Sequence, residues 1–312
     1  GTGPPVRVTV RRTPISPPPR AAVASAGVQQ PSGALFTQTP APPDPPPVPA
    51  TVSYSSLSAF RRCAYRYHLE REVGLREDRN DPLWQAVELA RPAGGLDAAV
   101  RGSLVHRLLE LYTDATPSRA EIVAVAAAED AGDLDDERAA DIERLCAAAH
   151  GSAVMARVSA ANVVRREHGF LLDIAGDVAP LVNGFIDVLA IEADGGALVV
   201  DYKTDTVAAG ADLEQLVAER YLIQRELYAL AALSIGAPHV DVVHLYLELP
   251  EAPAIARYVE DDIEQLRARL AAACAPLLSG LRPPSDRPGR YLCRGCPARS
   301  GLCIHDEEIT SA

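Results

Sequence analysis

The sequence predicts a mixed α/β protein. Segments 163–174, 181–192 and 197–203 are rich in Val, Leu and Ile and are separated by turn residues, so we predict three strands in a meander. A long helical pattern at about 212–235 follows, and a fourth strand is expected at 240–249. The order helix, three strands, helix, strand is typical of an α/β core.

Helical patterns account for most of the remaining ordered chain. Order should begin near Val52, and Ser55 or Ser56 is placed to cap a helix that runs to about Glu72. Further helices are expected at about 99–113, twice within the Ala-rich stretch 118–161, and at about 260–279, whereas 78–98 is expected to be irregular.

Proline usage divides the chain. Residues 1–50 hold 14 of the 26 prolines and show little periodic hydrophobicity. Such composition favours extended polyproline segments over a packed core. We therefore predict a disordered arm or interdomain linker over 1–50 and one folded domain over 51–312.

Composition narrows the function classes. No window approaches the 18 consecutive apolar residues of a membrane span, and the first residues lack a signal-peptide pattern, so we expect a cytoplasmic protein without membrane association. The net charge of -12 argues against a nucleic-acid coat protein, which is normally basic. It does not exclude a nuclease, which binds nucleic acid along a local channel.

A carboxylate and lysine group forms the main candidate for a catalytic centre. Asp187 ends an apolar strand, and Asp201 and Lys203 follow fourteen residues later, two apart on the next strand. Side chains two apart share a face, so these groups should converge. Carboxylates suit Mg²⁺, and lysine supplies a compact positive charge. Lys203 is the only lysine among 30 basic residues. The alternative is an exposed, ion-paired strand end.

Other polar residues are candidates for the same centre. His106 lies one helical turn after Gly102, and glycine within a helix is unfavourable unless close approach requires it. Gln224 and Tyr228 lie four apart on one helical stripe, and an amide there needs a hydrogen-bond partner. Each has an ordinary structural alternative, a packed histidine or a backbone-bonded amide. Glu167, in the first strand, stays open between a supporting role and a solvated position.

The last part of the chain carries a metal-binding pattern. Cys293 and Cys296 form a C-x-x-C pair, and Cys303 completes three cysteines within eleven residues, among glycines and prolines. In an intracellular chain such a group favours metal ligation over disulfides. Both zinc and iron–sulfur clusters accept thiolates.

The fourth ligand must come from elsewhere, and two candidates remain. Cys63 lies at the other end of the ordered chain, and His305 would complete a Cys₃His zinc site. Cys146 and Cys274 fall within Ala-rich helices, where we interpret them as small core residues.

Taken together, six segments in this order resemble the RecB-like nucleases of the PD-(D/E)xK superfamily. The likeness is strongest to AddB-type and related actinobacterial helicase–nuclease modules with a 4Fe–4S cluster. It covers about residues 53–305. The segments are Ser56-Leu57-Ser58 to Cys63-Ala64-Tyr65-Arg66-Tyr67, Gly102-x-x-x-His106, Gly184-Phe185-Ile186-Asp187, Asp201-Tyr202-Lys203, Gln224-x-x-x-Tyr228 and the cysteine tail.

The resemblance implies a restriction-endonuclease-like core and a Mg²⁺- or Mn²⁺-dependent deoxyribonuclease. It implies that the metals are held by His106, Asp187, Asp201 and the Tyr202 carbonyl. It also implies that Lys203, Gln224 and Tyr228 serve catalysis with the two aspartates. The same resemblance implies that the cluster is bound by Cys63, Cys293, Cys296 and Cys303.

The expected setting is DNA end processing and recombinational repair with a helicase partner. No G-x-x-x-x-G-K-[ST] sequence is present, so a motor would lie elsewhere. The alternatives are a stand-alone repair exonuclease and a non-catalytic DNA-binding or scaffold subunit.

Overall fold

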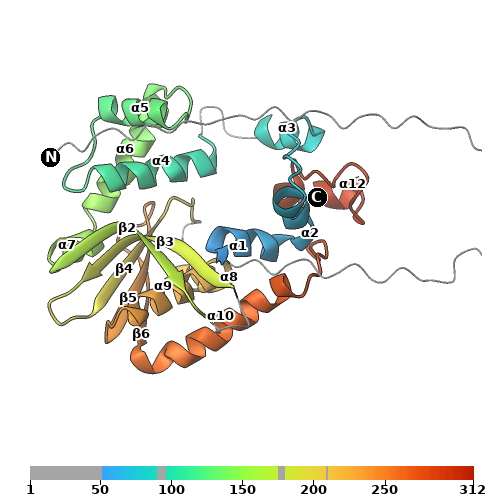
Figure 1. Cartoon of the computed structure of the whole chain (residues 1–312). Coiled ribbons are helices and arrows are strands. Elements are labelled where there is room, and N and C mark those ends of the chain that lie inside the picture. The colour runs from blue at the N-terminus through green and yellow to red at the C-terminus, as the bar shows by residue number, and fades with distance from the viewer. Residues whose placement is uncertain (1–50, 90–95, 175–179, 209) are drawn as a thin grey trace, which may run out of the picture. The chain divides into compact units, whose positions relative to one another are not determined.

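The computed structural model describes residues 51–89, 96–174, 180–208 and 210–312. The predicted arm or linker at 1–50 lies outside the described residues. The described chain is an α/β structure, as predicted, with one mixed sheet between two layers of helices (Figure 1). None of the described helices is long and apolar enough to cross a lipid bilayer.

The sheet has six strands, and β3 pairs with three of the others, β1, β2 and β4. β2, β3 and β4 form the predicted antiparallel meander, and β5 then pairs parallel to β4. Along one edge of β3 runs β2, so β1 and β4 must share the other edge. The strands are β1 Thr51–Ser53, β2 Val163–Leu172, β3 Leu181–Ile191, β4 Ala197–Lys203, β5 His239–Tyr246 and β6 Ala254–Val259.

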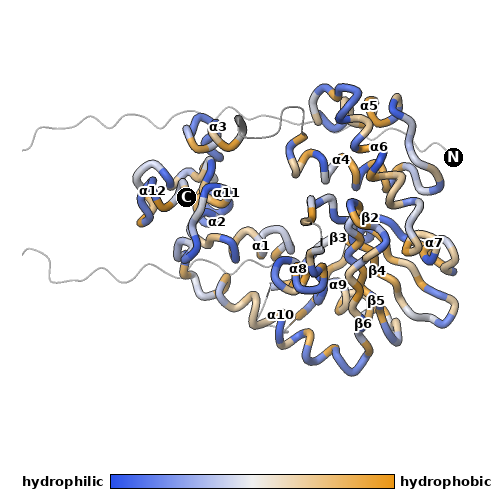
Figure 2. Tube along the Cα trace, turned by 180° about the vertical axis from the view of Figure 1, so that it is seen from behind, coloured by the Kyte–Doolittle hydropathy of each residue, from blue (hydrophilic) through white to orange (hydrophobic). Residues whose placement is uncertain are grey.

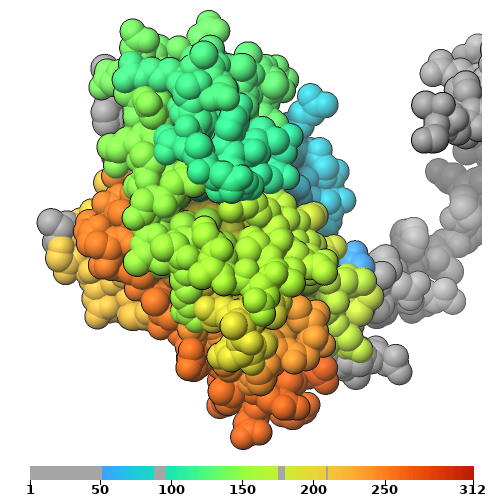
Figure 3. Space-filling model, turned by 90° about the vertical axis from the view of Figure 1, so that its left-hand side faces the viewer, coloured from blue at the N-terminus to red at the C-terminus, as the bar shows by residue number. Residues whose placement is uncertain are grey.

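Helices cover both faces of the sheet, because each face is apolar. β4 is buried at every position, and the strands carry much of the apolar colour in Figure 2. One core lies against α1, α9 and α10, and the other lies against α4 to α7. Figure 3 shows this second helical layer, α4 to α7, in teal and green, packed against the yellow-green strands. The helices are α1 Tyr54–Arg62, α2 Ala64–Tyr67, α3 Pro82–Leu89, α4 Ala98–Leu111, α5 Arg119–Ala128, α6 Asp136–His150, α7 Ala153–Ser159, α8 Leu213–Arg220, α9 Leu222–Ser234, α10 Ile263–Leu278, α11 Arg290–Cys293 and α12 Glu307–Ser311.

The first helix differs from the prediction at both its start and its continuity. Ser53, rather than Ser55 or Ser56, is the N-cap, and its hydroxyl accepts the Ser56 amide N–H at 3.1 Å. The helix then breaks at Cys63, whose backbone is extended and whose thiol accepts the Arg66 N–H at 3.4 Å. The chain continues as α2 and a π-helical turn at His68–Glu72. The break brings the cysteine out of the helix.

Other boundaries also differ from the sequence predictions. Residues 118–161 hold three helices rather than two, and 78–98 contains α3 instead of being wholly irregular. The helix expected over 212–235 is interrupted at Tyr221, which separates α8 from α9. β1 and β6 were not predicted, and the three residues of β1 are too few for a periodic pattern.

Candidate active site

Asp201 and Lys203 lie at the end of β4, on one face of the sheet, as strand alternation predicts. Asp201 is 1% exposed and Lys203 9% exposed. The ammonium Nζ lies 2.6 Å from Asp201 Oδ2. Tyr202, between them, points into the opposite core. Charges this deeply buried are costly unless paired, so the contact rules out an ordinary solvated strand end.

Gln224 and Tyr228 of α9 complete a polar chain around this pair. Lys203 Nζ donates to Gln224 Oε1 at 2.9 Å, and the Gln224 amide donates to Asp201 Oδ1 at 2.9 Å. The same amide donates to the Tyr228 phenol oxygen at 2.9 Å. Burial, and then the charges of Asp201 and Asp187, raise the pKa of Tyr228 well above its ordinary value. The phenol is therefore neutral, and the amide fixes carboxylate and ammonium together.

Asp187 reaches the same place from β3 through a local break in alternation. Ile186 and Leu189 lie in one core while Val188 lies in the other, so the strand shifts face at Asp187. β4 pairs with β3 only from Val188 onward. Asp187 Oδ2 therefore accepts the Tyr202 backbone N–H, at 2.8 Å, in place of a strand partner.

His106 enters from α4 in the helical layer above the sheet. Its Nε2 donates to the Tyr202 carbonyl at 3.0 Å, and its Nδ1 lies 3.3 Å from Asp187 Oδ2. Burial alone would lower the pKa of His106, but Asp187 and then Asp201 raise it to about 9. A Cβ at Gly102 would lie 3.3 Å from Thr204 Oγ1, so the glycine permits this close approach of helix and strand.

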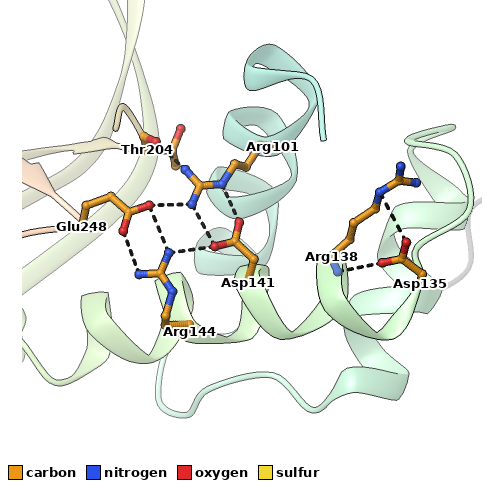
Figure 4. Close-up of polar contacts among 7 residues, drawn as sticks. All are labelled: Arg101, Asp135, Arg138, Asp141, Arg144, Thr204 and Glu248. Atoms are coloured by element: carbon orange, nitrogen blue, oxygen red, sulfur yellow. Dashed lines mark hydrogen bonds and ion pairs between the residues drawn. The ribbon is translucent and has the colours of Figure 1, made fainter. Parts of the chain in front are cut away.

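An ion-pair network anchors the start of α4, and sequence reasoning missed it (Figure 4). Arg101 Nη1 donates to the Thr204 carbonyl at 2.6 Å, one residue beyond Lys203. Its other nitrogens bind Asp141 at 2.6 and 3.0 Å and Glu248 at 2.7 Å. Arg101 thus ties the helical layer to the end of β4. Nothing in the local sequence pairs these residues, which are 40 to 147 positions apart.

Glu167 of β2, which the sequence left open, belongs to the site. Ligand atoms of His106, Glu167 and Asp187 all lie within 4.8 Å of one another. Glu167 has φ of 43°, a left-handed backbone that is rare outside glycine and concentrates at functional sites. Burial and then the charge of Asp187 raise its pKa. In the antiparallel register of β2 and β3, Glu167 and Asp187 both fall between the pairs Arg166–Val188 and His168–Ile186.

The aromatic rings of Tyr221 and His244 pack beside Lys203 and Asp201, and this arrangement was not predicted. Lys203 Nζ lies 4.0 Å from the centroid of the Tyr221 ring. The His244 ring lies against Tyr221, with centroids 5.9 Å apart, and His244 Nε2 is 3.8 Å from Asp201 Oδ2. Burial lowers the pKa of His244 to about 4, so the ring is neutral.

The carboxylates and the histidine fit a divalent cation. Asp201 Oδ2 is buried and has no aligned hydrogen-bond donor among the described residues, although Lys203 lies close to it. His106, Asp187 and Asp201 line one cavity of about 700 Å³ with Lys203. Oxygen and imidazole donors at this spacing suit Mg²⁺ or Mn²⁺.

A separate group of thiols gathers where the chain's last segment meets α2. Cys63 and Cys303 both act electrostatically on the Cys293 thiol, and Cys63 and Cys293 on the Cys296 thiol, while burial raises the pKa of Cys293 and Cys296. Arg66 crosses to this segment and donates to the Leu292 carbonyl at 2.6 Å.

The two remaining cysteines and His305 take no part in that thiol group. Cys146 and Cys274 are buried in the two sheet cores, as predicted for packing residues. His305 Nε2 donates to the Ser285 carbonyl at 2.7 Å.

A family model described as the PD-(D/E)XK nuclease superfamily matches residues 51–303. No curated protein sequence matches the chain. A candidate exonuclease from Eubacterium rectale is 13% identical, with a TM-score of 0.44 over 76% of this chain and 85% of that one. The protein SSO0001 is 18% identical, with a TM-score of 0.39 over 82% of this chain and 86% of that one.

The family match spans the sheet, both helical layers and the cysteine segment. It also spans Asp187, Asp201 and Lys203. The chain therefore belongs to the PD-(D/E)XK nuclease superfamily and has its restriction-endonuclease-like α/β fold.

Proposed function

We propose that this protein is a Mg²⁺- or Mn²⁺-dependent deoxyribonuclease that acts in DNA end processing. One observation carries the proposal: His106, Asp187, Asp201 and Lys203, from three separate elements, converge on one cavity in a chain of a nuclease superfamily. Convergence of costly buried charges is typical of catalytic sites rather than of stabilising ion pairs.

The metal would be held by His106, Asp187, Asp201 and the Tyr202 carbonyl, with Glu167 added to the set implied by the sequence. A bound divalent ion supplies Lewis-acid stabilisation of phosphoryl oxygens. The protein's own part is to fix these donors in advance. The Tyr202 amide orients Asp187, and α4 brings His106 within 3.3 Å of it.

Lys203 would stabilise the charge that develops on the phosphoryl group. Its ammonium is held by Asp201 and Gln224 and lies against the Tyr221 ring, so it needs little reorganisation during the reaction. Gln224 keeps both neighbours aligned, and Tyr228 fixes the Gln224 amide. These two are positioning residues.

We further propose a 4Fe–4S cluster on Cys63, Cys293, Cys296 and Cys303. The mutual electrostatic influence of these thiols and the opening of the chain at Cys63 support it. A single zinc ion with Zn–S bonds of about 2.3 Å would bring its ligands within roughly 4 Å of one another. Among the described residues, no cysteine belongs to a group that tight, and the Ser285 carbonyl engages His305. The resemblance of the cysteine pattern to nuclease modules that carry a 4Fe–4S cluster favours a cluster instead. It would link positions 63 and 293 across most of the domain.

The likeness to helicase-associated modules supports a motor partner, supplied by another domain or chain, and a role in recombinational repair. The net charge of -12 supports the same view, because a module this acidic gains from a partner that holds the DNA. Reduced thiolates also favour a cytoplasmic location.

Digestion of defined DNAs tests the proposal. Linear single-stranded, linear duplex and covalently closed circular DNA are incubated with Mg²⁺, Mn²⁺ or EDTA. We expect metal-dependent cleavage that Asp187→Asn abolishes and the exposed control Asp114→Asn retains. Cleavage of closed circles identifies an endonuclease, and sparing of them identifies an exonuclease. Absence of cleavage in every metal contradicts the proposal.

A further inference from the structure

A second hollow, of about 490 Å³, lies between α1 and α8, which Figure 1 shows close together. We call it the basic groove. Three exposed arginines line it, Arg61 and Arg62 at the end of α1 and Arg220 at the end of α8. Tyr54 and Tyr221 form part of its wall, and Glu219 is its acidic member. The groove is therefore locally positive in a protein of net charge -12.

These three arginines are free to meet a ligand. The chain has 42 acidic residues against 30 basic ones, and arginines such as Arg101 and Arg157 each bind two carboxylates. By contrast, the side chains of Arg61, Arg62 and Arg220 form no ion pair or hydrogen bond with any described residue. An unpaired guanidinium is a ready donor to phosphate oxygens.

The basic groove adjoins the catalytic cavity. Tyr221 lines both, and its ring touches the Lys203 ammonium. Tyr54 connects them electrostatically as well: after burial, the charge of Asp201 raises its pKa, while Arg61 and Arg62 oppose that rise. A ligand that extends from the catalytic carboxylates past Tyr221 therefore enters the basic groove and meets the three arginines.

A positive groove with aromatic side chains is typical of sites that track a single nucleic-acid strand. The two hollows, of about 490 and 700 Å³, are each the size of a small-ligand site. A thread of a few nucleotides fits such hollows, whereas an intact duplex would bridge over them. We propose that Arg61, Arg62 and Arg220 bind backbone phosphates of a single DNA strand. These phosphates would be the neighbours, on the same strand, of the phosphate that is cleaved. This inference rests on the proposed function.

Binding of a fluorescein-labelled oligo-dT in Ca²⁺, followed by anisotropy at several salt concentrations, tests the groove. The variant replaces Arg61, Arg62 and Arg220 with Gln, and the matched control replaces the exposed Arg76, Arg165 and Arg287, which removes the same charge. We expect the groove variant to bind on the order of 10-fold or more weakly. Loss of three phosphate contacts should also reduce the slope of log K against log salt by about 2.

A small substrate separates the groove from the catalytic centre. Bis(p-nitrophenyl) phosphate reaches the catalytic cavity without occupying the groove, so with Mn²⁺ the groove variant should hydrolyse it at the wild-type rate. Its KM for oligo-dT should rise while kcat stays unchanged. If the wild type binds oligo-dT through these arginines but hydrolyses neither substrate, the groove stands and the nuclease proposal falls.

Three results would overturn the inference. The first is equal affinity and salt slope in the groove and control variants. The second is an equal loss of affinity for a blunt duplex of the same length. The third is failure of the wild type to bind oligo-dT. Circular dichroism of both triple variants establishes that each remains folded.

Discussion

Replacing Lys203 with arginine tests the lysine's role without removing its charge. Around Nζ, Asp201 Oδ2 lies at 2.6 Å, Gln224 Oε1 at 2.9 Å and the centroid of the Tyr221 ring at 4.0 Å. The side chain is only 11% exposed. A planar guanidinium is wider than an ammonium and presents its donors in a rigid fork. It cannot occupy this position without displacing a neighbour or turning into the cavity.

The expected cost follows from what Lys203 would do. Loss of one preorganised electrostatic contact to the transition state lowers kcat by about 10²- to 10³-fold, or roughly 2.7–4 kcal/mol. Overpacking of a buried position costs about 1–3 kcal/mol of stability. The positive charge beside Asp201 remains, so the buried carboxylate keeps a partner. We therefore expect Lys203→Arg to fold but to lose most cleavage.

Single-turnover cleavage of an end-labelled oligonucleotide measures this loss, and anisotropy in Ca²⁺ measures binding, which should change little. Arg165→Lys, at an exposed position of β2, is the reverse exchange and should be neutral. A cleavage rate for Lys203→Arg within about threefold of wild type would exclude this role of Lys203, because a loss of about 10²-fold is the least that the role implies.

Three further predictions concern the proposed iron–sulfur cluster, the ion pairs of Arg101 and the side-chain amide of Gln224. Protein purified without oxygen should absorb broadly near ~400 nm. Cys63→Ala should abolish this absorbance, and the control Cys146→Ala should retain it. A colourless protein that contains one zinc ion would refute the cluster. Burial raises the pKa of Asp141, but hydrogen bonds and charge from Arg101 and Arg144 hold it below its ordinary value. The pairing with Arg101 therefore stabilises the fold above the unfolded pKa and is lost as pH falls through the folded one. The difference in Tm between wild type and Arg101→Gln should then be full at pH 7 and shrink below about pH 4; a pH-independent difference would contradict the network. Gln224→Leu should lower kcat by 10-fold or more with little change in oligonucleotide affinity, and an unchanged kcat would remove its positioning role.

Local patterns in the sequence carried much of the fold and part of the site. Strand alternation placed Asp201 and Lys203 on one face, because residues two apart on a regular strand always share a face. The four-residue spacing of Gln224 and Tyr228 put both on one face of α9, because residues four apart on a helix lie about one turn from each other. Glycine at 102 marked a close approach that the structure contains.

Features that depend on distant contacts were beyond the sequence. The face of Asp187 follows from an irregularity in β3 opposite Glu167, whose left-handed backbone no local pattern indicates. Arg101 meets Glu248 across 147 positions. The helix breaks at Cys63 although the sequence has helical periodicity on both sides. The break accompanies contacts with the last segment, such as Arg66 to the Leu292 carbonyl, which form only in the folded chain. Tertiary context overrides propensity at these points.

We propose above that the carboxylates of Asp187 in β3 and Asp201 in β4 serve metal-dependent cleavage of DNA. Single-turnover cleavage of an end-labelled single-stranded oligonucleotide, titrated with Mg²⁺, tests it most directly in wild type and Asp201→Asn. We expect saturable, EDTA-sensitive cleavage by the wild type and a loss on the order of 10²-fold or more in the variant at every Mg²⁺ concentration. Cleavage that persists in EDTA, or a variant that cuts at the wild-type rate, would contradict it.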